Sequence, residues 1–245
     1  MFRPVAMIFA ATLSLVAVPA SADTQDDADS IAIGEAMDAL RAKDFGQTVA
    51  KAQEIIGRFE AGRSPDTAYV CASGPGDTLT QLMSAAAAAN EGSSKETATT
   101  VALSPNICDA YFLKGFALID LGRRDDALPN LEAAVAMDPD NNHYANELGE
   151  WYKAGRQWEK SLEIFTRASE TNDLSLDFME DKAAVQRIRN NRRCRSYRGI
   201  AFNQSELRHW DEARAALDKC LAIVPGDEAS LQELNYIAEQ SGKDR

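Results

Sequence analysis

Histidine and cysteine are scarce in this sequence of 245 residues, which contains two histidines and four cysteines. Two histidines leave little room for a histidine-rich metal site or for a catalytic apparatus that depends on histidine. Basic residues are also outnumbered, 26 against 38 acidic residues, and the formal net charge is −12. The phosphates of DNA or RNA would repel such a chain, which argues against general nucleic-acid binding. Because 45% of the residues are hydrophobic and 26% are charged, we expect a globular protein with a buried core.

The longest apolar run, Val5–Val18, is about 14 residues, short of the ~20 that a transmembrane helix needs. Arg3 precedes it, and the small residues Ala20-Ser21-Ala22 follow it, so residues 1–22 are typical of a secretory signal peptide. A membrane anchor is the alternative, but acidic residues follow at once and no later segment reaches spanning length. We expect a soluble protein, periplasmic or secreted, that begins at Asp23 after cleavage.

The cysteines are even in number and include no C-x-x-C pair. In an oxidising compartment two disulfides are expected, whereas a zinc site would need other ligands at other spacings. Four cysteines allow about three pairings, and their number alone does not choose among them. The four are Cys71, Cys108, Cys194 and Cys220.

Two stretches, starting at Cys108 and Cys194, repeat the same residue types at the same separations. In both, a tyrosine follows the cysteine after 3 residues, an alanine after 19 and a proline after 31. A third frame starts at Asn142, 34 residues after Cys108. Small and large side chains recur at matching places in these frames: Gly115, Gly149, Ala127, Ala213, Ala134 and Ala168, and Tyr111, Tyr152, Leu131 and Phe165.

These residues resemble the tetratricopeptide repeat (TPR) family, whose unit of about 34 residues is a helix–turn–helix. The resemblance implies an all-α solenoid of helical hairpins with an irregular N-terminal part. Small residues would let the helices approach closely, and large residues would fill the gaps between them. The sequence departs from the family at Ser161 and Cys220, where alanine is usual, and at Asp173, where a closing proline is usual.

The repeat frame divides the chain into segments. They are the signal peptide 1–22, a divergent TPR-like hairpin 23–60, a disulfide-held loop and helix 61–107, TPR 1 at 108–141, TPR 2 at 142–175, an inserted helix 176–193, TPR 3 at 194–227, and a capping helix and tail 228–245.

Finer expectations follow from local composition. Residues 62–76 are rich in Gly, Ser and Pro and predict a loop, and residues 77–90 predict a helix with Asp77 as its N-cap. Asn190-Asn191 marks a possible break before TPR 3, and residues 228–239 predict the helix that covers the last repeat.

The repeat frame also implies a disulfide pairing. In an antiparallel hairpin the first turn of the first helix lies beside the last turn of the second. Cys194 opens its unit and Cys220 lies near the end of the same unit, so this pair is expected, which leaves Cys71 with Cys108.

Motifs of catalytic chemistry are missing from the sequence. It contains no G-x-S-x-G, no H-E-x-x-H and no phosphate-binding glycine loop followed by lysine. His143 and His209 are expected to be exposed surface residues. We therefore expect a protein that is not an enzyme and that has no cofactor and no metal.

In the TPR family, stacked first helices line a concave groove that binds extended peptides or partner helices. The resemblance implies that the partner-binding positions in this sequence are Phe112, Phe116, Asn146, Glu150, Lys153, Arg195, Arg198 and Phe202. Core packing is an equally good explanation for the phenylalanines. Some members clamp a C-terminal carboxylate with Lys, Arg and Asn, and Asn146, Arg195 and Arg198 match that clamp in part.

Six arginines lie between Arg187 and Arg198, in a chain that is otherwise acidic. The favoured interpretation is internal pairing with acidic neighbours such as Glu180 and Asp181, or with TPR 2. The sharper hypothesis is that Arg195 and Arg198 bind an anionic group such as a peptide carboxylate, because guanidinium suits bidentate recognition.

These observations favour a non-catalytic protein–protein interaction module, a TPR scaffold or adaptor of the cell envelope that binds a peptide or protein partner in its groove. The alternatives are a binder of small anionic ligands or cell-wall fragments, or an accessory subunit of an envelope enzyme. The sequence names neither the partner nor the oligomeric state.

Overall fold

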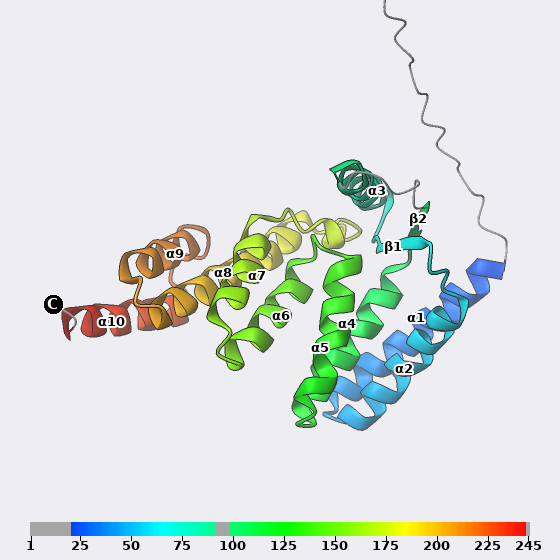
Figure 1. Cartoon of the computed structure of the whole chain (residues 1–245), viewed down its shortest axis with the longest axis horizontal. Coiled ribbons are helices and arrows are strands. Elements are labelled where there is room, and N and C mark those ends of the chain that lie inside the picture. The colour runs from blue at the N-terminus through cyan, green and yellow to red at the C-terminus, as the bar shows by residue number, and fades with distance from the viewer. Residues whose placement is uncertain (1–20, 92–98, 244–245) are drawn as a thin grey trace, which may run out of the picture.

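A computed structural model describes residues 21–91 and 99–243, and the expected signal peptide lies outside this part except for Ser21 and Ala22. The described residues form antiparallel helix pairs that stack side by side from α1 and α2 to α8 and α9, and α10 packs against α9 at the end (Figure 1). The predicted helical-hairpin solenoid is confirmed. The elements are α1 (Ser21–Arg41), α2 (Phe45–Gly62), β1 (Thr67–Cys71), α3 (Pro75–Glu91), β2 (Thr99–Leu103), α4 (Pro105–Asp120), α5 (Arg124–Met137), α6 (Asn142–Ala154), α7 (Trp158–Glu170), the 3₁₀ helix η1 (Leu174–Leu176), α8 (Lys182–Glu206), α9 (Trp210–Ile223) and α10 (Glu228–Lys243).

The four hairpins turn through one residue in the left-handed backbone region. These residues are Lys43, Gly122, Arg156 and Arg208, with φ of 60°, 73°, 56° and 62°. Glycine adopts this conformation without steric cost, whereas other residues are strained there. Only one hairpin places glycine at this position. In the α6–α7 turn the neighbouring Gly155 keeps a negative φ of −85°, and Arg156 takes the left-handed place.

Phe165 on α7 is fully buried between two glycines on neighbouring helices. A Cβ atom added to Gly149 on α6 would lie 2.8 Å from the ring, and one added to Gly199 on α8 would lie 2.5 Å from it. No side chain fits at such distances without movement of its neighbours. The pattern of small and large residues therefore allows α6, α7 and α8 to pack around one ring.

The segment between α2 and α4 differs from expectation. Residues 67–71 were expected to be a loop but form strand β1, which pairs in parallel with β2 from Thr67 opposite Thr99 to Cys71 opposite Leu103. Helix α3 begins at Pro75 because proline is well suited to a first helical turn. Asp77 is not the N-cap: it accepts a hydrogen bond at 2.8 Å from the backbone N–H of Ser73, which precedes the helix.

The cysteines pair as the repeat frame implied. Cys71 at the end of β1 is bonded to Cys108 on α4, and Cys194 on α8 is bonded to Cys220 on α9. The first disulfide attaches the β1–α3–β2 insert to the solenoid, and the second closes the hairpin of α8 and α9. Two disulfides fit an oxidising compartment.

Helix α8 is continuous through Asn190-Asn191, where a break was expected. Asn190 accepts a hydrogen bond from Gln186 on the same helix at 2.7 Å and donates one to the backbone carbonyl of Ile223 at 3.3 Å. The second contact joins this turn of α8 to the C-terminal end of α9. Among the described residues, no helix has the length and apolar character needed to cross a membrane.

Candidate partner-binding groove

Five of the expected partner-binding residues line one pocket of about 230 Å³. Helix α6 supplies Glu150 and Lys153, and helix α8 supplies Arg195, Arg198 and Phe202. Their spacing of three or four residues along each helix places them on one face. Helix α10 closes the pocket with Ala229 and Glu233, which sequence reasoning did not place there.

Each cation of this pocket already has a carboxylate partner. The amine of Lys153 lies 2.6 Å from Glu150, the guanidinium of Arg195 lies 2.9 Å from Glu147, and that of Arg198 lies 2.8 Å from Asp227. The three cationic side chains keep exposed fractions of 23%, 33% and 32%. They are therefore positioned in advance and still reachable by a ligand.

An aromatic ring adds an apolar wall to this pocket. The Lys153 amine lies 4.9 Å from the centroid of the Phe202 ring, within the range of a cation–π contact. Glu233 is half-buried in the same pocket, and burial raises the pKa of its carboxyl more than nearby Lys153 lowers it. The pocket thus combines three cations, two carboxylates and one ring.

Phe112 and Phe116 lie outside this pocket. Phe112 is 6% exposed, and its ring centroid lies 4.6 Å from that of His143 and 5.1 Å from that of Tyr144. Phe116 is partly buried against the same core. Phe112 packs between α4 and α6, and Phe116 packs against the same core cluster; core packing was the alternative explanation for both.

Asn146 is also placed differently from the expected groove position. Its side chain is 1% exposed, donates to Asn142 and to the backbone carbonyl of Arg192, and accepts a hydrogen bond from Ser196 at 2.7 Å. A side chain that is buried and fully paired is not available to a ligand. The partial match to a carboxylate clamp is therefore reduced to Arg195 and Arg198.

His143 was expected to be exposed, and this expectation is wrong. Its ring lies against that of Phe112 with the two planes tilted by 47°, and burial, with help from Arg192 and Arg195, lowers the pKa of the imidazole to about 4. The side chain is therefore neutral at pH 7. His209 is exposed, as expected.

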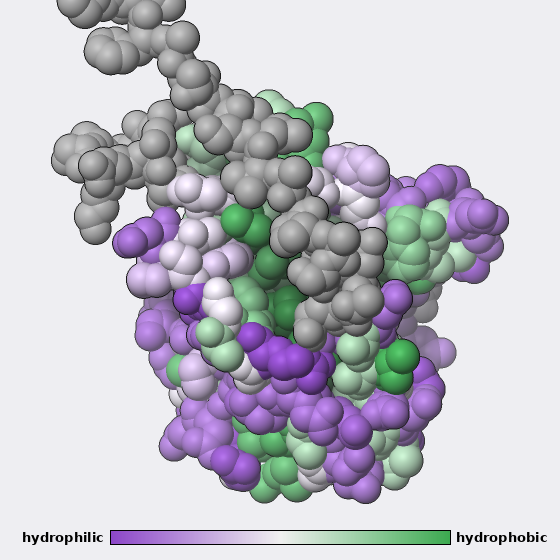
Figure 2. All heavy atoms as spheres, turned by 90° about the vertical axis from the view of Figure 1, so that its right-hand side faces the viewer, coloured by the Kyte–Doolittle hydropathy of each residue, from purple (hydrophilic) through white to green (hydrophobic). Residues whose placement is uncertain are grey.

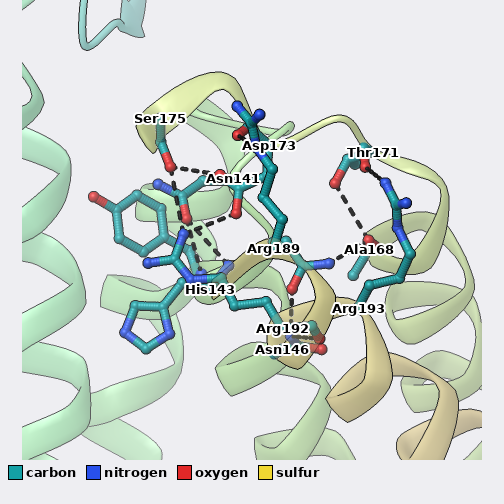
Figure 3. Close-up of polar contacts among 12 residues, drawn as sticks. Asn141, His143, Asn146, Ala168, Thr171, Asp173, Ser175, Arg189, Arg192 and Arg193 are labelled. Atoms are coloured by element: carbon teal, nitrogen blue, oxygen red, sulfur yellow. Dashed lines mark hydrogen bonds and ion pairs between the residues drawn. The ribbon is translucent and has the colours of Figure 1, made fainter. Parts of the chain in front are cut away.

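The arginines of α8 are mostly engaged within the chain, as the favoured interpretation stated. Figure 3 shows Arg189, Arg192 and Arg193 reaching from α8 to the segment that follows α7. Arg189 pairs with Asp177 at 2.8 Å, Arg192 pairs with Asp173 at 2.8 Å, and Arg193 donates to the backbone carbonyl of Thr171 at 2.7 Å. Among the residues that the structure describes, no ion pair joins an arginine to Glu180 or Asp181; Asp181 instead caps the N-terminus of α8.

A buried acid–phenol pair was missed in the sequence. Tyr144 on α6 donates a hydrogen bond of 2.6 Å to Asp109 on α4. Burial raises the pKa of Asp109 and also raises the pKa of Tyr144. The pair links the first helices of two neighbouring hairpins. The positions of Asp109 and Tyr144 in the sequence give no sign that these two residues meet, because other aspartates and tyrosines occur at similar places.

A second hollow lies at the α1 end of the molecule. Figure 2 shows hydrophobic atoms in a recess of this mostly hydrophilic face. A pocket of about 630 Å³ lies between the starts of α1 and α3 and the end of β2, and its lining includes Leu79, Leu82 and Pro105. Asp26 is the one charged residue in that lining. The two pockets therefore differ in chemistry, one cationic and one apolar.

The hairpins, their shared left-handed turns and the glycines packed against large side chains define a solenoid of the TPR type. No family model matches the chain. A stretch of 79 residues, 32% of the chain, is 32% identical to Superkiller complex protein 3 of Homo sapiens, but it covers only 5% of that protein's length.

Several solved structures have a similar fold. PilF of Pseudomonas aeruginosa matches with a TM-score of 0.56 at 12% identity, covering 90% of this chain and 72% of that one. MamA matches with a TM-score of 0.54 at 14% identity, covering 89% and 84%. A protein of Podosopora anserina with nearly identical TPR-like repeats matches with a TM-score of 0.54 at 15% identity, covering 88% of each chain. At these identities the likeness establishes the TPR fold alone.

Proposed function

We propose that the chain is a non-catalytic scaffold or adaptor that binds a peptide or protein partner in the concave groove. The observation that carries this proposal is the pocket of Lys153, Arg195, Arg198 and Phe202. Pre-positioned cations beside an aromatic wall suit an extended peptide with an acidic group next to an apolar one. TPR 1 at 108–141, TPR 2 at 142–175 and TPR 3 at 194–227 are the proposed units of the scaffold.

We also propose that the protein works in the cell envelope, in the periplasm or after secretion. Two disulfides and the apolar leader with its small-residue cleavage site support this location. Cell fractionation with N-terminal sequencing tests it. We expect the mature chain to start at Asp23 in the envelope fraction, and a cytosolic chain with an intact leader would contradict the proposal.

Site-specific cross-linking tests where a partner binds. A photoreactive amino acid replaces Ala229, an exposed residue that lines the pocket, or Ala222, an exposed residue of α9 outside it. We expect a cross-linked partner with the label at position 229 and none with the matched label at position 222. Adducts at position 222 alone, or equal adducts at both, would contradict groove binding.

The second candidate function is recognition of a small anionic ligand, because Arg195 and Arg198 lie in one pocket. Thermal unfolding of the purified chain with and without a small dicarboxylate separates the two functions. A ligand-dependent rise in the unfolding temperature that Arg195→Ala abolishes would favour the second candidate. No rise would favour a peptide or protein partner.

A further inference from the structure

Helix α3 is joined to the solenoid by a buried hydrogen bond between residues far apart in sequence. The side-chain amide of Gln81 donates to the Asp138 carboxyl at 3.0 Å. Gln81 is 1% exposed and Asp138 is 3% exposed, so water does not compete for this contact. Asp138 lies at the C-terminal end of α5, and the bond therefore ties the insert to the turn between α5 and α6.

Asp138 has neutral hydrogen-bond donors and no paired cation. Its second carboxyl oxygen accepts a hydrogen bond from the Asn141 amide at 3.0 Å. In the part of the chain that the structure describes, no lysine or arginine forms an ion pair with Asp138. A buried carboxylate without a cation is costly when it is charged.

The groups that face Asp138 are mostly acidic. Asp77 comes from α3, Asp140 from the same turn as Asp138, and Asp173 from the segment before η1. Helix α3 also lies against η1, so these carboxyls meet where the insert touches the solenoid.

The other charged and titratable groups nearby offset the negative charge around Asp138 only in part. Arg192 on α8 neutralises Asp173 at 2.8 Å, and Arg167 on α7 acts on Asp140. Tyr144 on α6 remains protonated, because burial first and then the nearby carboxyls Asp109 and Asp138 raise its pKa. Asp77, on the insert itself, has a hydrogen bond from the Ser73 N–H but no ion pair among the described residues.

We propose that Gln81 and Asp138 form a pH-sensitive latch, which holds α3 on the solenoid in acidic conditions and weakens as the pH rises to neutral. The Cys71–Cys108 disulfide keeps the insert attached when the latch opens. This conformational device goes beyond the proposed binding function and does not depend on it.

The direction of the pH dependence follows from the number of protons that the docked and released states bind. Burial, followed by the charges of Asp77, Asp173 and Asp140, raises the pKa of Asp138 to about 7 in the docked state, and the Asn141 hydrogen bond lowers it less. In a released state the carboxyl returns toward its ordinary pKa of 3.8. The docked state therefore binds more protons between these values, and docking weakens as the pH rises through this window. One proton changes the opening equilibrium by about tenfold per pH unit.

Hydrogen exchange measured by mass spectrometry on the whole disulfide-bonded chain tests the latch. Exchange of the α3 amides, corrected for the intrinsic effect of pH, is compared at pH 5, 6, 7 and 8, with α6 as the internal reference. We expect the open fraction of α3 to rise by about tenfold per unit from pH 5 to 7 and to level off above that.

Three variants complete the test. Asp138→Asn removes the charge and should make α3 exchange independent of pH, whereas the matched variant Asp125→Asn, at an exposed position of α5, should behave like the wild type. Gln81→Ala removes the hydrogen bond and should give fast α3 exchange at every pH, which keeps the test valid if Asp138→Asn fails to fold. Flat exchange in the wild type, or an unchanged pH profile in a folded Asp138→Asn variant, would overturn the proposal.

Discussion

The two joints between successive TPR hairpins differ in chemistry. Between α4 and α6 the contact is mainly aromatic, with Phe112 and Tyr144 in one core cluster and a single hydrogen bond from Tyr144 to Asp109. Between α6 and α8 the contact is polar, with Asn146 and Ser196 in a buried hydrogen-bond network and Arg195 paired with Glu147. Units that look equivalent in sequence therefore stack in different ways. The polar joint also fixes the helix face that carries the pocket cations.

Phe165 is the side chain on which both α6 and α8 rest, so its removal should have the largest effect. Truncation to alanine leaves a cavity between Gly149 and Gly199. We expect Phe165→Ala to lower the free energy of unfolding by about 3–5 kcal/mol in urea denaturation. The exposed Phe178 provides the control, and Phe178→Ala should change stability by less than about 0.5 kcal/mol.

The hairpin beyond the polar joint has a small apolar core and should depend on its disulfide. Replacing Cys194 and Cys220 together with alanine frees a loop whose ends are 26 residues apart. We expect a loss of about 3–4 kcal/mol in the chain-entropy account. Denaturation of the oxidised wild type and of the double variant measures it. Equal stability of the two proteins would show that packing alone holds this hairpin.

The polar joint itself can be weakened at Asn146. Asn146→Ala leaves Ser196, Asn142 and the Arg192 carbonyl without one of their buried partners. We expect a cost of about 1–3 kcal/mol in chemical denaturation. Asn172→Ala, at an exposed position, should be close to neutral. A neutral Asn146→Ala would mean that the network is not what specifies this joint.

The smallest expected effect concerns the hairpin turns and should be stabilising. Arg156 has a φ of 56°, and Gly122 holds the equivalent place in the preceding hairpin. We expect Arg156→Gly to raise stability by about 0.5–1 kcal/mol and Gly122→Arg to lower it by a similar amount. Thermal unfolding of both variants checks this reciprocal pair, and two changes of the same sign would contradict the explanation.

Much of the fold was predictable because TPR packing depends on side-chain size at fixed places. The positions of Gly149, Phe165 and the cysteines were enough to predict the hairpins and the disulfides. The strands β1 and β2 were missed because two short parallel strands separated by a helix leave no local alternation to detect. The burial of Asn146 was missed because an isolated polar residue on a helix is usually exposed, and only its partners on α8 show otherwise.

The pocket residues on α6 and α8 could be predicted from the sequence, but the residues that α10 adds to the pocket could not. Glu150, Lys153, Arg195, Arg198 and Phe202 were found because their places in the repeat frame coincide with the first helices. The contribution of α10 depends on how the last helix docks, which the repeat frame does not describe.

The most direct test of partner binding in the pocket is the affinity of the chain for the partner found by cross-linking, measured with and without the pocket arginines. Arg195→Ala with Arg198→Ala is compared with Arg187→Ala, an exposed arginine of the same helix, after circular dichroism confirms the fold. The account predicts that the double variant binds at least about tenfold more weakly, because it loses two charge-assisted contacts, and that Arg187→Ala binds like the wild type. Unchanged affinity of the folded double variant would contradict it.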